Sequence, residues 1–286
     1  MKKIKIISDS TCDLSEELIK QNDITIIPLL VLFGEEEYKD GVTIKTRELY
    51  DKVKKVNYLP KTSAISPADF AKTFLEYTKK GYDIIYTGIG STLSATFNSA
   101  KIAKSELNLD NVYLIDSLNL SSGSGLVVLK IAKLRDEGMD ASSIKENIEK
   151  HVIPNVRSQF AIQTMEYLHR GGRCNSLTRF LGTMIKLKPI IKVVNGVLSV
   201  GKKPLGPMTK ALDVMLKDAV SEKDKIDPDF FFVTHSLAYD SADYILPKVK
   251  EQFDFVKNIY CTEAGCVISS HCGEGTIGLL YILKDE

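Results

Sequence analysis

The feature that most constrains this chain is a repeated alternation of apolar runs and helical segments across its first half. The apolar runs with strand character are residues 2–8, 24–33, 82–87 and 111–116. The segments with helical spacing are 13–21, 66–81, 97–107 and 124–138. Such alternation predicts a parallel sheet covered by helices, because parallel neighbours need a long crossover connection.

Local start and stop signals support individual elements. Ser66 is a predicted N-cap, Pro67 occupies the first helical position and Gly81 ends the segment. Asp13 is likewise expected to cap the helix that begins there. In the second apolar run Pro28 indicates an edge strand or a bulge, because proline has no N–H to donate to a ladder.

The second half has a different pattern. Residues 190–203 are typical of a β-hairpin with Asn195-Gly196 as its two-residue turn. Further strands are predicted at 158–165, 230–235, 266–271 and 277–283, and helices at about 207–220 and 240–252. The sequence therefore predicts an α/β chain of two domains. They are an N-terminal domain (1–157) with a parallel sheet flanked by helices, and a C-terminal α+β domain (158–286) with a mixed sheet.

Charge and hydropathy exclude two kinds of partner. The 286 residues include 38 Lys and Arg against 37 Asp and Glu, a net charge of +1. Without a net positive field the chain does not attract a polyanion, so nucleic acid is not expected as a partner. The longest apolar stretch, 24–34, is shorter than the roughly 20 residues that a spanning helix needs, so no membrane span is expected.

Cysteine content and the first residues bear on location. Five cysteines, an odd number without a regular framework, fit a reducing compartment better than a secreted scaffold. The run before Asp9 is too short for the apolar core of a signal peptide. We therefore expect a cytoplasmic protein.

Three polar loops follow predicted strands: 8–13, 61–66 and 90–96. Ligands of open α/β sheets bind at the carboxyl ends of the strands, where these loops are expected to lie. The loop 90–96 fits an anion cradle, since its hydroxyls would join unpaired N–H groups at a helix start. Each loop alone is more simply explained as helix capping, and only their convergence favours a site.

A serine nucleophile is the alternative use of the loop 90–96. The elbow motif Gly-x-Ser-x-Gly is absent, because the sequence runs Gly-Ile-Gly-Ser-Thr from Gly88. A hydrolase would also need a histidine beside Ser91 or Ser94, and the chain has only four histidines. A small-molecule α/β hydrolase that uses a serine at this cleft therefore remains the second hypothesis.

The second half adds candidate polar residues. Arg170 and Arg173 flank a glycine pair, and an arginine fork suits a carboxylate or a phosphate, although a solvated turn is equally consistent. His271 alone is more often a packed or capping residue than a functional one. With Cys261, Cys266 and Cys272 it suggests zinc, but no Cys-x-x-Cys pair is present and buried inert thiols are expected instead.

Two further motifs are rejected. Residues 273–278 spell Gly-x-Gly-x-x-Gly, but a terminal strand follows instead of the long helix that a dinucleotide needs. The acidic segment 34–41 lacks the Asp-x-Asp-x-Asp-Gly pattern of a calcium loop, and a solvated loop is expected. No metal and no cofactor is expected, and the chain has no P-loop.

Several ordered motifs together resemble the DegV family, the bacterial fatty-acid-binding proteins that serve a fatty acid kinase. The resemblance covers essentially the whole chain. Ala95 stands where the family has glycine, and Glu274 where it usually has proline. The matching segments are SDSTCDL (8–14), KTSAISP (61–67), STLSATFNSA (91–100), EYLHRGGR (166–173) and SSHCGEGTIG (269–278).

The resemblance implies a two-domain, DegV-like fold with an apolar tunnel for one long-chain fatty acid. It implies that Thr62 and Ser94 hold the carboxylate, with Arg173 and His271 in the same polar network. Segment 179–191 would supply apolar wall residues. If position 95 needed a positive φ, alanine there would be strained.

The resemblance also implies that the chain is not itself an enzyme. It would be the lipid-binding subunit of a fatty acid kinase, and the kinase partner would supply ATP. The binding protein would present the carboxylate for acyl-phosphate formation and release the product to phospholipid synthesis.

Overall fold

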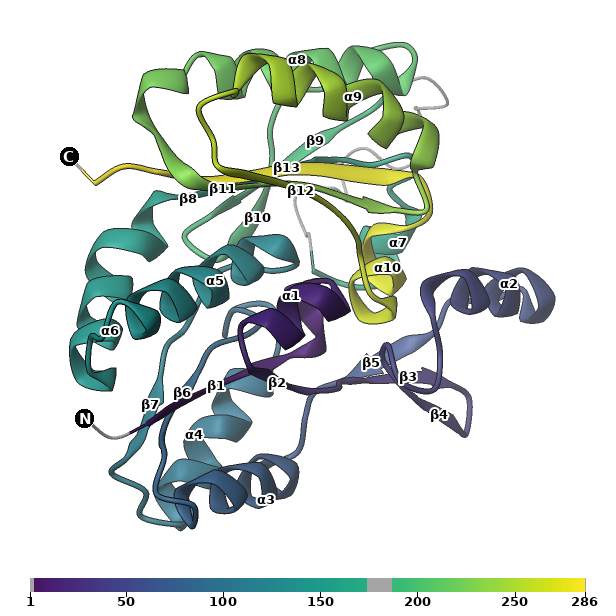
Figure 1. Cartoon of the computed structure of the whole chain (residues 1–286). Coiled ribbons are helices and arrows are strands. Elements are labelled where there is room, and N and C mark those ends of the chain that lie inside the picture. Colours follow the sequence, from purple (N-terminus) through teal and green to yellow (C-terminus); the bar gives the residue numbers. More distant parts are fainter. Residues whose placement is uncertain (1–2, 174–186, 286) are drawn as a thin grey trace.

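The computed structural model describes residues 3–173 and 187–285. Its N-terminal lobe is built on a parallel four-stranded sheet of order β2-β1-β6-β7, as the alternating pattern predicts (Figure 1). These strands are β1 (Ile4–Asp9), β2 (Ile24–Ile27), β6 (Asp83–Tyr86) and β7 (Val112–Leu114). The helices are α1 (Glu16–Gln21), α3 (Pro67–Thr78), α4 (Thr96–Glu106), α5 (Ser122–Asp136) and α6 (Ala141–Asn147).

Helices cover both faces of this sheet. Aromatic side chains of α3 and α4, among them Phe70 and Phe97, pack on the face that includes Ile84. Helices α1, α5 and α6 pack on the opposite face, which includes Ile6 and Ile85. The predicted signals of α3 are confirmed, because Ser66 accepts a hydrogen bond from the Asp69 N–H.

The predicted strand 24–33 divides at Pro28 into two strands of different sheets. β2 is an edge strand of the parallel sheet, whereas β3 (Leu30–Phe33) starts a small antiparallel sheet. That sheet has the order β4-β3-β5, with β4 (Glu36–Lys39) and β5 (Lys61–Ser63), and α2 (Thr46–Val56) connects these two strands. Proline ends the first ladder because it cannot donate a backbone hydrogen bond.

The C-terminal lobe has a mixed six-stranded sheet of order β10-β9-β8-β13-β11-β12. Only β11 and β12 pair in parallel, so the predicted mixed sheet is confirmed. The predicted hairpin is also present, with positive φ at Asn195 and Gly196. The strands are β8 (Val156–Ala161), β9 (Ile190–Val194), β10 (Val197–Val200), β11 (Ile226–Ser236), β12 (Asn258–Glu263) and β13 (Thr276–Leu283).

Two longer helices pack on the outer face of this sheet, and two short ones lie toward the N-terminal lobe (Figure 1). The former are α8 (Met208–Val220) and α9 (Tyr239–Gln252), and the latter are α7 (Glu166–Arg170) and α10 (Cys266–Cys272). Short 3-10 turns at Ser10–Cys12, Ile153–Asn155 and Lys223–Lys225 and a π-helical turn at Ile148–Val152 complete the described elements. The domain division at 157 and 158 stays a prediction, although the sheet changes at β8.

Helix α5 lies between the two sheets (Figure 1). Every residue from Ser122 to Ala132 is buried. Its apolar side chains share one core with Ile6 of the parallel sheet and with Phe232 and Leu280 of the mixed sheet. A helix buried on all sides has no polar face, which explains why this segment lacks an amphipathic pattern.

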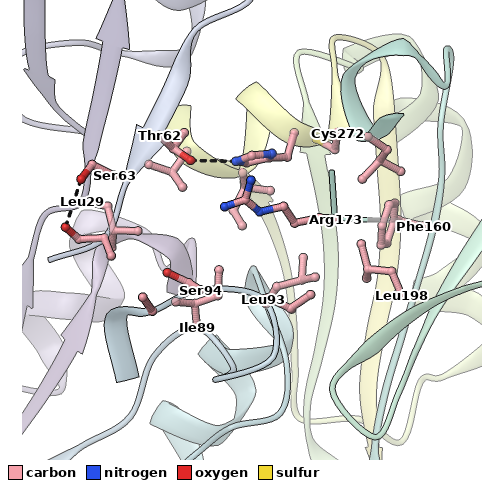
Figure 2. Close-up of a pocket in the computed structure, with 17 residues that line it drawn as sticks. Leu29, Thr62, Ser63, Ile89, Leu93, Ser94, Phe160, Arg173, Leu198 and Cys272 are labelled. Atoms are coloured by element: carbon pink, nitrogen blue, oxygen red, sulfur yellow. Dashed lines mark hydrogen bonds between the residues drawn. The ribbon is translucent and has the colours of Figure 1, made fainter. Parts of the chain in front are cut away.

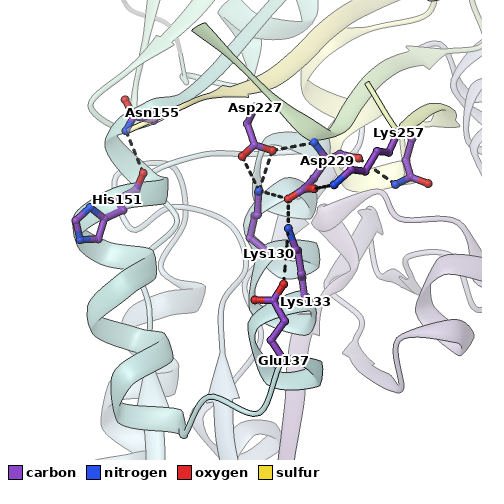
Figure 3. A network of polar contacts seen from close by, with 9 residues as sticks. Lys130, Lys133, Glu137, His151, Asn155, Asp227, Asp229 and Lys257 are labelled. Carbon is purple, nitrogen blue, oxygen red and sulfur yellow. Dashed lines mark hydrogen bonds and ion pairs between the residues drawn. The ribbon is translucent and has the colours of Figure 1, made fainter. Parts of the chain in front are cut away.

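An ion-pair cluster fixes the middle of α5 to β11 (Figure 3). Lys130 donates to Asp227 at 2.8 Å and to Asp229 at 2.6 Å, and Asp229 also accepts from Lys133 and Lys257. Burial of Asp229 acts to raise its pKa, but the hydrogen bonds from the three lysines outweigh it and hold that pKa well below its usual value. The ionised carboxylate therefore stabilises the folded state.

We predict that Asp229→Asn lowers the free energy of unfolding at pH 7 by about 2 kcal/mol, between the values for exposed and buried ion pairs. The contribution of Asp229 is complete above the unfolded-state pKa of about 3.9 and is lost as the pH falls through the lower folded-state pKa. Urea unfolding of both proteins should therefore show the difference shrinking below about pH 4. Asp136→Asn, at an exposed pair with Arg135, is the control. An unchanged difference at low pH would contradict the prediction.

Candidate functional site

A cavity of about 260 Å³ lies between the two lobes. The structure brings all four residues expected at the site to its wall, from segments far apart in the chain. Each occupies a different element or loop. They are Thr62 in β5, Ser94 in the loop before α4, Arg173 three residues after the end of α7, and His271 in the last turn of α10.

Figure 2 shows the polarity of this cavity. Thr62 and Ser94 lie on the side formed by the N-terminal lobe, whereas Phe160 and Leu198 lie on the side of the six-stranded sheet. The side chain of Arg173 extends between the two sides. The polar side chains thus gather toward the N-terminal lobe, where Leu29 and Ile89 also line the cavity, and the side toward the six-stranded sheet is apolar.

Thr62 and His271 form the polar contact that joins the lobes here. Thr62 Oγ1 and His271 Nε2 are 2.8 Å apart. Burial, with a smaller contribution from the positive charge of Arg173, lowers the pKa of His271 to about 4. The imidazole is therefore neutral at pH 7 and offers one donor and one acceptor.

Gly171 allows the chain to pass close to this ring. A Cβ at Gly171 would lie 2.4 Å from His271 Nδ1. The Nδ1 atom is buried and has no hydrogen-bond partner among the described residues. Gly171 is thus required by close packing against the imidazole.

Ser94 combines the two roles considered for its loop. Its Oγ accepts a hydrogen bond from the Thr96 N–H at 3.2 Å and lies 2.9 Å from Thr96 Oγ1, so it helps to cap α4. The same side chain lines the cavity. Ala95 also lines the cavity, with a φ of −70°, so the expected strain at this position is absent.

The first polar loop, 8–13, supports the site without lining it. Asp9 accepts hydrogen bonds from the Ile89 N–H at 2.9 Å and from the Tyr86 hydroxyl at 3.0 Å. A Cβ at Gly88 would lie 1.9 Å from Asp9 Oδ2, so only glycine fits there. Of the three polar loops, only 61–66 and 90–96 line the cavity. Asp9 of the loop 8–13 instead holds the start of the loop that carries Ser94.

The segment predicted as a strand at 266–271 is helix α10, so that prediction is wrong. Asp13 Oδ1 accepts from the Gly265 N–H at 2.8 Å, and Asp40 accepts from the N–H groups of Cys266 and Val267. These carboxylates satisfy free donors at the helix start and interact favourably with its dipole. Because both come from the N-terminal lobe, no signal in the segment itself predicts the helix.

Two expectations for these aspartates are corrected as well. Asp13 has a positive φ of 49° and does not cap α1, whose N-cap is Ser15. Asp40 was expected in a solvated loop but is only 2% exposed. Burial raises the pKa of both carboxyl groups, because removing a carboxylate from water disfavours its charged form.

The other candidates do not join the site. Arg170 forms an exposed ion pair with Glu166 on α7. The His271 imidazole contacts Thr62 and not Ser91 or Ser94, so the serine hypothesis gains no support. Cys272 lines the cavity with a pKa raised by burial to about 12. Within residues 3–173 and 187–285, no group of three or more His, Cys, Asp or Glu residues could hold a metal ion.

The described apolar walls come from segments other than the one expected. Of the expected wall segment 179–191, residues 187–191 do not line the cavity, and residues 179–186 lie outside the described part of the chain. The hairpin contributes Leu198, and β8 contributes Phe160, which lies on the same face of the strand as Ser158. No described helix is long and apolar enough to cross a membrane.

Fold and cavity together define a two-lobed α/β protein with a cavity between its lobes. The model of a family described as "Uncharacterised protein, DegV family" matches residues 3–284. A DegV domain-containing protein from Clostridium acetobutylicum is 36% identical over 99% of this chain and 100% of its own length. The chain belongs to the DegV family.

Solved structures agree with this assignment. One described as "Fatty Acid Binding of a DegV family Protein from Thermus thermophilus" is similar with a TM-score of 0.90 and 28% identity, over 98% of this chain and 99% of that one. A "fat acid (stearic acid)-binding protein" from Eubacterium ventriosum has a TM-score of 0.86 and 25% identity, over 99% of both chains. The predicted DegV-like fold class is confirmed.

We predict that the His271 imidazole titrates near pH 4, as measured by NMR of its ring protons, with His271→Gln used to assign the signals. Arg173→Gln should raise this pKa, because it removes a positive charge that disfavours the imidazolium. Lys61→Gln, on the neighbouring exposed residue of β5, is the charge-matched control and should leave it unchanged. Titration of His271 at its ordinary value near 6.5 would contradict the assigned environment.

Proposed function

We propose that this protein binds one long-chain fatty acid, with the carboxylate at the polar end of the cavity and the acyl chain along the apolar walls. The observation that carries the proposal is the polarity of a single cavity, in which Thr62 and Ser94 lie apart from Phe160 and Leu198. Arg173 extends between the two sides, and His271 contacts Thr62. The fatty-acid binding described for the Thermus and Eubacterium relatives supports it.

The hydrogen-bond pattern suggests how the carboxylate is held. A buried N–H without a partner is costlier than a buried lone pair, so we assign the His271 proton to Nε2. Nε2–H then donates to Thr62 Oγ1, and the Thr62 hydroxyl proton remains free for a carboxylate oxygen. Ser94 offers a second hydroxyl, and Arg173 offers a positive charge.

The acyl chain supplies most of the binding free energy in this proposal. Each buried methylene contributes about 0.8 kcal/mol. The fourteen or so methylenes of palmitate would give roughly 11 kcal/mol before the costs of ordering and association are subtracted. The head group then sets orientation more than affinity.

We further propose that the protein presents the carboxylate to a separate fatty acid kinase and is not itself an enzyme. Arg173 is exposed, so a partner could reach the head group without unfolding the cavity. The sequence contains no P-loop, so ATP would come from the partner. Four described cysteines are free thiols, in line with the proposed cytoplasmic location.

We predict that protein purified from bacteria carries a fatty acid, seen as an added mass in native mass spectrometry. Thr62→Val keeps the shape of the side chain and removes its hydroxyl, and should weaken palmitate binding roughly ten- to hundredfold, as expected for the loss of a hydrogen bond to a charged group. Thr43→Val, at an exposed threonine outside the cavity, is the control. No acyl mass and no uptake of added palmitate or oleate would overturn the proposal.

The presentation step has its own test. Arg173→Gln and His271→Gln should lower acyl-phosphate formation with a cognate kinase at least tenfold, while urea unfolding shows that both variants remain folded under the assay conditions. Arg170→Gln removes a nearby arginine that lies outside the cavity and should leave the rate unchanged. Unchanged phosphorylation in both cavity variants would reject their roles and leave fatty-acid binding untouched.

A further inference from the structure

A second, smaller cavity of about 40 Å³ adjoins the first. Four residues line both spaces and therefore form the partition between them. They are Leu120, Phe160, Ile268 and Cys272. Since Figure 2 places Phe160 away from Thr62 and Ser94, this inner chamber lies beyond the apolar end of the larger cavity.

The inner chamber exists because small residues face it from the six-stranded sheet. Gly278 lies in the middle of β13, on the same face as Thr276 and Leu280. A Cβ at Gly278 would lie 3.3 Å from Phe160 Cβ and 3.1 Å from the Gln159 carbonyl oxygen. A strand glycine commonly marks a close approach, and here it leaves space behind the Phe160 ring.

The hydroxyl groups around this chamber are already bonded within the protein. Ser158 donates to Asn119 Oδ1 at 2.7 Å, and Thr276 donates to the Cys272 carbonyl at 2.8 Å. Ser236 Oγ lies 2.6 Å from the Tyr50 hydroxyl. With these hydroxyl groups satisfied, the chamber presents mainly hydrocarbon.

We propose that the inner chamber receives the methyl end of the acyl chain, and that Phe160 and Gly278 set the chain length that the protein prefers. This inference rests on the proposed function, because it assigns one end of the ligand that the larger cavity would hold. A volume of about 40 Å³ exceeds the roughly 10–15 Å³ that a cavity needs to hold one water molecule, so the chamber takes about one or two carbons.

The test compares the affinities of lauric, myristic, palmitic and stearic acids for the full-length protein. Gly278→Ala fills the chamber and should weaken binding of the longest acids by about four-fold for each displaced methylene, with little change for the shortest. Phe160→Leu removes part of the partition and should shift the preference toward longer acids. Opposite shifts from the two variants are the expected result.

Matched controls separate chamber effects from general ones. Ile277→Val lies on the same strand as Gly278 but faces the core against α8 and α9, and it should leave the length profile unchanged. Thr62→Val should weaken all four acids by the same factor, because it acts at the head group. If Gly278→Ala fails to fold, Phe160→Leu alone still measures the partition.

Two failures are distinguishable. A length profile that stays the same in Gly278→Ala and Phe160→Leu, while the wild type binds fatty acids, would overturn the inference and leave the proposed function standing. Absence of binding by the wild type would overturn the proposed function itself. A uniform loss of affinity in both chamber variants, without a shift between acids, also overturns the inference.

Discussion

The burial of α5 on every side is the constraint on which the rest of the structure depends. A helix without a polar face needs apolar cover all around, and here both sheets supply it from opposite sides. Its cation Lys130 is balanced by Asp227 and Asp229 of β11. The two lobes are therefore held in one arrangement, and the cavity can form along their seam.

Helix α10 is a second place where the two lobes contact each other. Asp13 and Asp40 of the N-terminal lobe bind the first N–H groups of a helix that belongs to the other lobe. The opposite end of the same short helix carries His271 to Thr62. Buried carboxylates are costly, as their raised pKa values indicate, and here that cost accompanies the placement of an imidazole at the cavity.

The cavity's chemistry follows from burial as much as from residue type. His271 is neutral at pH 7 because it is desolvated, and Arg173 beside it supplies the positive charge. The neutral imidazole of His271 can donate one hydrogen bond to the Thr62 hydroxyl. A charged imidazolium would instead repel the neighbouring guanidinium of Arg173. The space at the apolar end depends on Gly278, because a larger residue there would place a side chain in the inner chamber.

Local patterns in the sequence determined the parallel sheet, the Asn195-Gly196 hairpin and the limits of α3, because capping, turn geometry and periodicity act over a few residues. Motif resemblance selected Thr62, Ser94, Arg173 and His271, which the structure brings to one cavity. Only the tertiary structure decided that 266–271 is helical and that Asp40 is buried, because contacts from over 200 residues away determine both. It also decided the two-chambered shape of the cavity, since that volume depends on how side chains of separate strands and helices pack together.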